Sequence, residues 1–401
     1  MILPTPSSPH AAPADPPTNP PTNPPVDLLA WLALLSCPGV GRQTARQLLQ
    51  HFGGPQAVLD AAAGRSAHAL KGLGSGSLSA LRTLSASVFE AHERTQRWLQ
   101  SNPRAAVITL EDPRYPPSLR ESADAPLLLY ALGRSELLQR PSLAIVGSRS
   151  ATPHGLATAQ EFARHLSERG LTIVSGLALG IDAAAHHGAL PHPGSTIAVV
   201  GTGLDLCYPQ RHLALAQRIS EEGLLLSEYP LGTPALRDHF PQRNRVIAGL
   251  CAGTLVIEAT VGSGSLITAR LALESGREVF AVPGSILSPQ SRGCHSLIRQ
   301  GALLVEHPED VLQDLQLTWP SEPLGPGSST TPENALEISE YSHIPTELLC
   351  ALDLMGHAPC TLDTLSERSG HSPAEMAAHM LQGELMGLIG RLPGGRFQRV
   401  A

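Results

Sequence analysis

Residues 143–149 read Leu-Ala-Ile-Val-Gly-Ser-Arg, a short apolar run that ends in a glycine. Four apolar residues followed by glycine are typical of a buried parallel strand that enters a tight turn. Residues 155–169 then show apolar side chains at helical spacing. A strand, a glycine turn and a helix place backbone N–H groups where an anion can bind. Ser148 and Arg149 add a hydroxyl and a cation, so the stretch predicts a phosphate site; a plain turn with a solvated arginine is the alternative.

Similar apolar runs alternate with helical stretches between residues 143 and 315. This alternation predicts an α/β domain with a mostly parallel sheet and helices on both faces. Ligands of such sheets bind at the carboxyl ends of the strands, so functional residues are expected directly after them. Besides the first strand, we expect strands over residues 171–175, 196–200, 223–227, 254–258, 278–282 and 302–305.

The composition limits the functions that the chain can have. With 401 residues, 42% of them hydrophobic and 16% charged, it is long enough for several globular domains, and no apolar run approaches the ~20 residues of a membrane span. The formal net charge of −7 argues against indiscriminate nucleic-acid binding, so any such site must be a local basic patch. Six scattered cysteines without a Cys-x-x-Cys pair indicate reduced thiols in the cytoplasm and argue against a zinc module.

The N-terminal quarter of the chain is expected to be helical. Residues 1–25 are rich in Pro, Ala, Ser and Thr and predict a disordered leader. Within residues 26–100, two helical patterns flank Cys37-Pro-Gly-Val-Gly41, which predicts a helix-hairpin-helix, and residues 70–76 contain a degenerate second copy. Glycine N–H groups in such hairpins can contact a DNA backbone. Because lysine and arginine are scarce nearby, a purely structural role is slightly favoured.

The remaining segments frame the predicted sheet. Residues 101–316 hold a connector and the α/β domain, where we interpret 102–133 as a connector that packs on the main domain. Residues 317–340 have the composition of a linker. Residues 341–401 predict a winged helix: three helices and a hairpin around Pro-Gly-Gly. Its third helix contains no Arg or Lys, so a protein-contact or regulatory role is favoured over reading of the major groove.

Four predicted strand ends supply side chains that suit a nucleic acid. They are the segments 147–149, 175–182, 240–245 with Arg237 just upstream, and 258–265. Together they offer backbone amides, hydroxyls, arginines and the aromatic ring of Phe240. Phosphate contacts combined with an aromatic on which a base can stack are typical of sites for single-stranded nucleic acid.

These motifs resemble, in the same order, those of DNA-processing protein A, the DprA/Smf family, over about residues 113–310. The resemblance implies a Rossmann-like domain that binds single-stranded DNA, forms a homodimer and loads the RecA recombinase in natural transformation. A lysine common in the family's pocket would be Arg237 here, which keeps the charge but changes the geometry. By motif position, the implied DNA pocket uses Gly147, Ser148, Arg149, Arg237, Phe240, Arg243, Asn244, Gly262 and Ser263.

Each side chain is expected to have a distinct role. We expect Arg149 and Arg243 to bind phosphates, Arg237 and Arg245 to extend the basic strip, and Phe240 to stack a base. The expected protein is a non-enzymatic, cytoplasmic single-stranded-DNA-binding protein without a metal or cofactor. We expect the backbone amides around Gly147, Gly176 and Gly262 to complete the DNA pocket.

Other classes of site fit the sequence less well. Gly201-Thr-Gly203 begins a dinucleotide fingerprint, but its third glycine would fall on Leu206, and no Gly-Lys-Ser/Thr of a P-loop occurs. A nucleotide-processing hydrolase of the related phosphoribohydrolase fold stays open as the alternative, although Thr268 or Ala269 stands near the place of its catalytic glutamate.

Three histidines and two carboxylates have simpler interpretations than catalysis. His186, His187 and His192 have no Cys or carboxylate spaced to complete a metal site. Asp182 and His186 are one helical turn apart and are expected to hydrogen-bond each other and fix the loop after the second strand. Glu258 is expected to orient Arg149 or Arg243.

Overall fold

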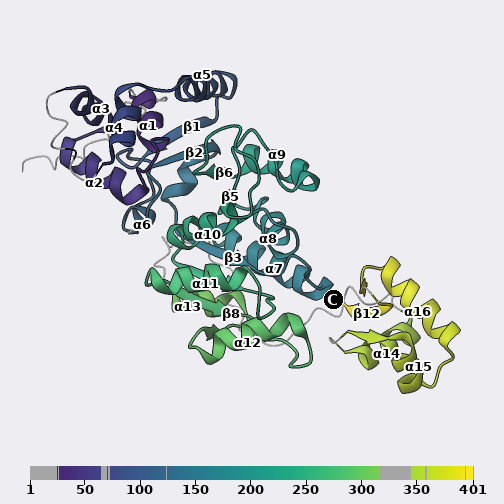
Figure 1. Cartoon of the computed structure of the whole chain (residues 1–401). Helices are drawn as coiled ribbons and strands as arrows, with labels where there is room; N and C mark the ends of the chain where they lie inside the picture. The colour runs from purple at the N-terminus through teal and green to yellow at the C-terminus, as the bar shows by residue number, and fades with distance from the viewer. Residues whose placement is uncertain are drawn as a thin grey trace, which may run out of the picture.

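Three parts follow one another along the chain: a helical N-terminal part, a central α/β part and a small C-terminal domain (Figure 1). The computed structural model describes residues 25, 27–64, 70, 73–122, 124–316, 345–356, 359–392 and 394–400. The predicted leader, apart from residue 25, and the whole predicted linker lie outside the described residues.

The N-terminal helices form the predicted helix-hairpin-helix. The turn after Cys37 joins the first two helices, and Gly39 adopts a positive φ of 76° that favours glycine. Of the second copy, Lys71 and Gly72 lie outside the described residues. Trp31, which is 2% exposed, belongs to a core that the helices share with the first two strands of the sheet. The helices are α1 (Leu28–Leu35), α2 (Arg42–Phe52), α3 (Pro55–Ala63), α4 (Ser75–Arg82) and α5 (Ala86–Ser101).

The central sheet has nine described strands, and the seven from β3 to β9 are parallel to one another. In space the order is β1-β2-β6-β5-β4-β3-β7-β8-β9. The predicted mostly parallel sheet is therefore confirmed. The strands are β1 (Ala105–Thr109), β2 (Leu128–Gly133), β3 (Ser142–Val146), β4 (Thr172–Ser175), β5 (Thr196–Val199), β6 (Leu224–Ser227), β7 (Gly253–Val256), β8 (Glu278–Ala281) and β9 (Leu303–Leu304).

The segment that we interpreted as a connector is part of this sheet. β1 pairs antiparallel with β2, and β2 pairs antiparallel with β6. Every residue of β1 is buried, because Ala106 and Ile108 face the sheet core while Val107 faces the core of the N-terminal helices. β1 and β2 thus extend the sheet at one edge, and the N-terminal helices pack on one face of this extension.

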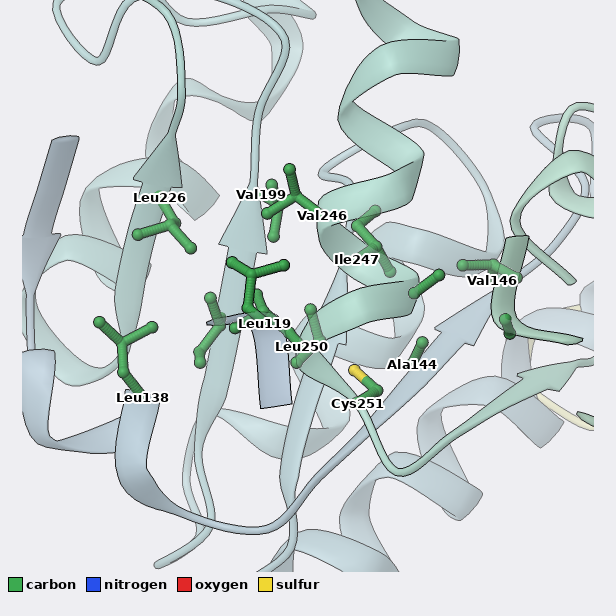
Figure 2. Packing of buried hydrophobic residues seen from close by; sticks show 14 of the residues in the cluster. Leu119, Leu138, Ala144, Val146, Val199, Leu226, Val246, Ile247, Leu250 and Cys251 are labelled. Atoms are coloured by element: carbon green, nitrogen blue, oxygen red, sulfur yellow. The ribbon is translucent and has the colours of Figure 1, made fainter. Parts of the chain in front are cut away.

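Side chains of β3 alternate between two cores, which proves that helices cover both faces. Leu143 and Ile145 pack against α7 (Pro153–Glu168), α8 (Ile181–Ala189) and α13 (Pro308–Asp314). Ala144 and Val146 face the opposite core, where Figure 2 shows Ile247 of α10 (His239–Leu250) on the side of Val146 and Val246 beside Val199. The other helices of this part are α6 (Pro117–Arg120), α9 (Leu213–Glu222), α11 (Ser265–Glu274) and α12 (Arg292–Arg299).

The strand order reverses at β3. The chain adds β4, β5 and β6 on one side of β3 and then returns to add β7, β8 and β9 on the other. Loops that leave β3 and β7 at their carboxyl ends therefore diverge and leave a crevice between them, which is where doubly wound sheets bind ligands. Of the predicted site residues, 147–149 follow β3 and 262–263 follow β7.

The C-terminal domain is the predicted winged helix. Ser372 begins the third helix with a capping box, because its Oγ accepts the Glu375 N–H and the Glu375 carboxylate accepts the Ser372 N–H. The strands pair in the order β10-β12-β11. The elements are α14 (Thr346–Met355), β10 (Cys360–Thr361), α15 (Leu362–Ser369), α16 (Pro373–Leu385), β11 (Ile389–Leu392) and β12 (Arg396–Arg399).

Candidate nucleic-acid interface

A cavity of about 670 Å³ opens at the crevice beside β3. Its walls are the loops after β3, β4, β5, β6 and β7 together with α10. We refer to it as the main cavity. Eight of the predicted site residues line it: Gly147, Ser148, Arg149, Arg237, Phe240, Arg243, Asn244 and Ser263.

The main cavity is positively charged in a chain of net negative charge. Arg149, Arg237 and Arg243 line it, and Asp182 is the one carboxylate among the described lining residues. Arg149 and Arg237 are exposed, and within the described chain no carboxylate forms an ion pair with either. Two cations without a carboxylate partner can bind an anionic ligand without first breaking a salt bridge.

Aromatic rings form one wall of the main cavity. The Arg149 guanidinium carbon lies 5.7 Å from the centre of the Phe240 ring, close enough for a cation–π contact. The Tyr208 ring lies 5.6 Å from the Phe240 ring, tilted by 40°. Phe240 is half-buried and Tyr208 is 52% exposed, so both present ring surface to a ligand. A base entering the cavity would find an aromatic face beside a cation.

Arg243 differs from the other two arginines because it is buried, with 5% exposure. Its Nη1 donates to the carbonyl oxygens of Gly176, at 2.6 Å, and Val199. Burial lowers the pKa of Arg243 to about 10, the nearby Asp182 carboxylate opposes this shift, and the positive charge of Arg149 adds to it. The guanidinium therefore remains charged at neutral pH, and it ties the ends of β4 and β5 together while lining the cavity.

Asp182 and His186 fix the loop after β4, but not by bonding each other as expected. Asp182 Oδ2 accepts the N–H groups of Gly176, at 3.1 Å, and Ala178, at 3.2 Å. His186 Nε2 accepts the N–H of Leu177 at 3.3 Å. Each side chain turns toward the loop because the loop amides would otherwise be buried without partners. Burial raises the pKa of Asp182 and lowers that of His186 to about 3.

The small residues of the main cavity are held by local contacts. Ser148 Oγ accepts the N–H of Ser150 at 3.1 Å, and Ser263 Oγ lies 2.7 Å from Ser265 Oγ. A Cβ at Gly147 would lie 2.6 Å from Ile181 Cγ1, so only glycine lets the β3 loop pack this closely on α8. Asn244 Nδ2 is 3.5 Å from the carbonyl of Gly264, linking α10 to the loop before α11.

Three predicted residues are not brought into the main cavity. Arg245 follows Arg243 by two positions, so it leaves α10 on another side, where it pairs with Asp124 and Glu228. The prediction that Arg245 extends the basic strip is therefore wrong. The Gly176 N–H is already bonded to Asp182 and is not a free donor. Gly262 is exposed next to the cavity but outside its lining.

Glu258 also has a different role from the one expected. Its carboxylate accepts the Thr152 N–H at 2.9 Å and the Thr152 hydroxyl at 2.6 Å. Thr152 in turn caps α7, because its Oγ1 accepts the N–H of Gly155 at 3.0 Å. Glu258 therefore stabilises the start of α7, and it binds neither Arg149 nor Arg243 among the described contacts.

Sequence reasoning missed several residues of the main cavity. Tyr208 lies in the loop after β5, and an exposed aromatic after a predicted strand was the signal that could have found it. Gln290 comes from the segment before α12, far along the chain, and no local pattern marks it. Within the described part of the chain, no group of three or more His, Cys, Asp or Glu residues could hold a metal ion. Among those same residues, no helix combines the length and apolar character needed to cross a bilayer.

Comparison with known proteins gives the family. Residues 106–316 match the model of the family described as DNA recombination-mediator protein A, and residues 346–395 match the DprA winged helix domain. Protein Smf of Escherichia coli (strain K12) is 42% identical over 301 residues, 74% of this chain and 78% of that protein. Protein Smf of Synechocystis sp. is 35% identical over 399 residues, 92% of this chain and 98% of that protein.

A solved structure supports the same assignment. The X-ray structure of DNA processing protein A (DprA) from Streptococcus pneumoniae is 39% identical, with a TM-score of 0.57, over 71% of this chain and 97% of that one. The family model alone spans more than half of the 401 residues. The chain therefore belongs to the DNA recombination-mediator protein A family, the DprA/Smf family.

Proposed function

We propose that the main cavity binds single-stranded DNA. The observation that carries this proposal is that cations without a carboxylate partner and aromatic rings that are at least partly exposed line one concave surface. Arg149 and Arg237 would contact phosphates, and Phe240 with Tyr208 would stack bases. A duplex keeps its bases stacked inside, so it could not use the aromatic wall. Membership of a family described as recombination mediators supports DNA as the ligand.

We further propose the cellular role that the family resemblance implies. The protein would protect incoming single-stranded DNA and load the RecA recombinase onto it during natural transformation, as a homodimer in the cytoplasm. Its six free cysteines agree with a reducing compartment. RecA loading is tested by measuring RecA filament assembly on DNA that is covered with single-strand-binding protein, with and without this protein.

The binding function is tested by titrating labelled single-stranded and duplex DNA of about 20 nucleotides across a salt series. Tight single-strand binding with an affinity that falls as salt rises supports the proposal. Equal affinity for duplex and single strand would contradict it, because the aromatic wall would then contribute nothing. Each phosphate contact on a single strand should add about 0.7 to the slope of log affinity against log salt.

We also propose that the protein is not an enzyme. Asp182 is the one carboxylate among the described lining residues, and one of its oxygens already accepts two backbone N–H groups. A nucleotide hydrolase needs a carboxylate that is free to act on a ribose. Incubation with nucleoside monophosphates tests this point, and release of a free base would establish the hydrolase instead.

A further inference from the structure

A second groove of about 380 Å³ adjoins the main cavity. The two share Ser150 and Gln290 in their linings, so one leads into the other. The second groove lies between the loop after β8 and the β-hairpin of the winged helix, formed by β11 and β12. We call this hairpin the wing. No acidic residue is among the described residues that line the second groove.

The wing is held close to the main cavity by the start of α7. A Cβ at Gly390 of β11 would lie 2.5 Å from Pro153 Cγ, so the wing packs on the first residue of α7 without space between them. α7 also contacts β12, and Figure 1 shows the two elements next to each other. The residues just before Pro153 form the loop that carries Arg149 and Ser150. The wing therefore packs against a residue that follows Arg149, a cation of the main cavity, by only a few positions in the sequence.

Arg396 is the cation of the second groove. It is exposed, lines the groove, and in the described residues forms no ion pair. Its cross-strand partner on β11 is Leu392, which lines the same groove, since opposite residues of an antiparallel pair share a face. On the loop after β8, Leu287 is 83% exposed and lines the groove as well. The groove thus combines an unpaired cation, an apolar side chain and several hydroxyls.

Arg391 of the same wing points to the other face. Its cross-strand partner is Phe397, a buried residue of the winged-helix core, and the Arg391 guanidinium lies 5.5 Å from that ring. Successive residues of a strand face opposite sides, so Arg391 and Leu392 diverge. Arg391 is therefore a control for Arg396 that carries the same charge on the same hairpin but lies outside the groove, where it pairs with Glu384 at 4.0 Å.

We propose that the second groove continues the path of the single strand, with Arg396 binding a phosphate beyond the main cavity. This inference rests on the proposed binding of single-stranded DNA in the main cavity. It gives the winged helix a DNA contact through its wing and not through α16, whose residues include no Arg or Lys. A short strand would fill the main cavity alone, and a longer one would reach the wing.

The test measures the affinity of the full chain for oligothymidines of about 6 and about 20 nucleotides, by fluorescence anisotropy. For Arg396→Ala we expect affinity for the long strand to fall about three- to tenfold, with a salt slope lower by about 0.7, because one charged phosphate contact is lost. Affinity for the short strand should not change. Arg396→Lys should recover most of the loss, and Arg391→Ala should bind both strands like the unaltered protein.

Two outcomes would overturn the inference. One is an unchanged affinity of Arg396→Ala for the long strand; the other is an equal loss in Arg391→Ala, which would show a general effect of surface charge. Arg149→Ala separates this inference from the proposed function, because loss of a main-cavity contact must weaken both strands. If Arg149→Ala weakens binding of both strands and Arg396→Ala weakens binding of neither, only the proposed role of the second groove is refuted. Thermal unfolding of each variant confirms that the wing remains folded.

Discussion

The Arg149 guanidinium lies over the ring of Phe240, with 5.7 Å between its central carbon and the ring centre. The first residue follows β3 and the second belongs to α10, so the contact joins two segments that lie far apart in the sequence. It leaves Arg149 exposed and Phe240 half-buried. The pair therefore presents a cation and an aromatic face on the same wall of the main cavity, and the proposed function depends on this arrangement.

Replacing Arg149 by Ala should weaken binding of single-stranded DNA by about 1–3 kcal/mol, because a charge-assisted phosphate contact is lost. The salt slope should fall by about 0.7. Titrations at several salt concentrations measure both. Arg169→Ala is the control, since Arg169 is also exposed but caps the far end of α7. An Arg149 variant that behaves like the control would remove Arg149 from the site.

Phe240→Leu keeps an apolar side chain and removes the aromatic face. We expect single-strand affinity to fall by about 1–3 kcal/mol, the range measured when base–aromatic stacking is removed. Affinity for duplex DNA should change much less, because its bases are already stacked. Parallel titrations with both forms measure the difference. A loss of equal size for duplex and single strand would argue that Phe240 acts only by supporting Arg149.

Gly176→Ala should displace Arg243 and destabilise the protein. A Cβ at this position would collide with the Arg243 guanidinium, whose Nη1 is fixed by two carbonyl oxygens. We expect a loss of about 1–3 kcal/mol in the free energy of unfolding, typical of overpacking. Gly262→Ala is the matched control: nothing lies within 4 Å of a Cβ there, so stability should hold within about 0.5 kcal/mol. Urea unfolding compares the two, and equal stabilities would contradict the contact.

His186 should make the protein less stable in mild acid. Its Nε2 accepts the Leu177 N–H and its Nδ1 lies 2.7 Å from Thr196 Oγ1, so the buried ring is neutral, and burial lowers its pKa to about 3. An unfolded histidine titrates near 6.5 and binds a proton more readily than the folded one between these values. The contribution of His186 to the free energy of unfolding is therefore fully present above pH 6.5, and it decreases as the pH falls.

Between pH 7 and pH 5 this contribution should fall by about 2 kcal/mol. Urea unfolding at both values measures it, and His186→Gln should remove this part of the pH dependence. The neighbouring charges of His187, His212 and Arg243 are present in both proteins, so the comparison isolates the His186 ring. An identical pH dependence in the variant would refute the assignment.

Local patterns predicted most of the fold. The alternation of apolar runs and helical stretches predicted the parallel strands and both helical layers, and the pattern of residues 341–401 predicted the winged helix. The role of residues 102–133 was not predicted correctly. β1 pairs with β2, and β2 joins the sheet by antiparallel pairing with β6, about 100 residues further along the chain; no local pattern specifies such a partner.

The site could be predicted only in part. The sequence alone determined which segments end at the same edge of the sheet, because parallel strands bring their carboxyl ends together. Only the tertiary structure decided that Arg243 faces the main cavity while Arg245 pairs with Asp124 and Glu228, since the packing of α10 selects which side of the helix faces which neighbour. The same holds for the wing: the sequence predicted a hairpin, but its packing on Pro153 determined that Arg396 lies beside the main cavity.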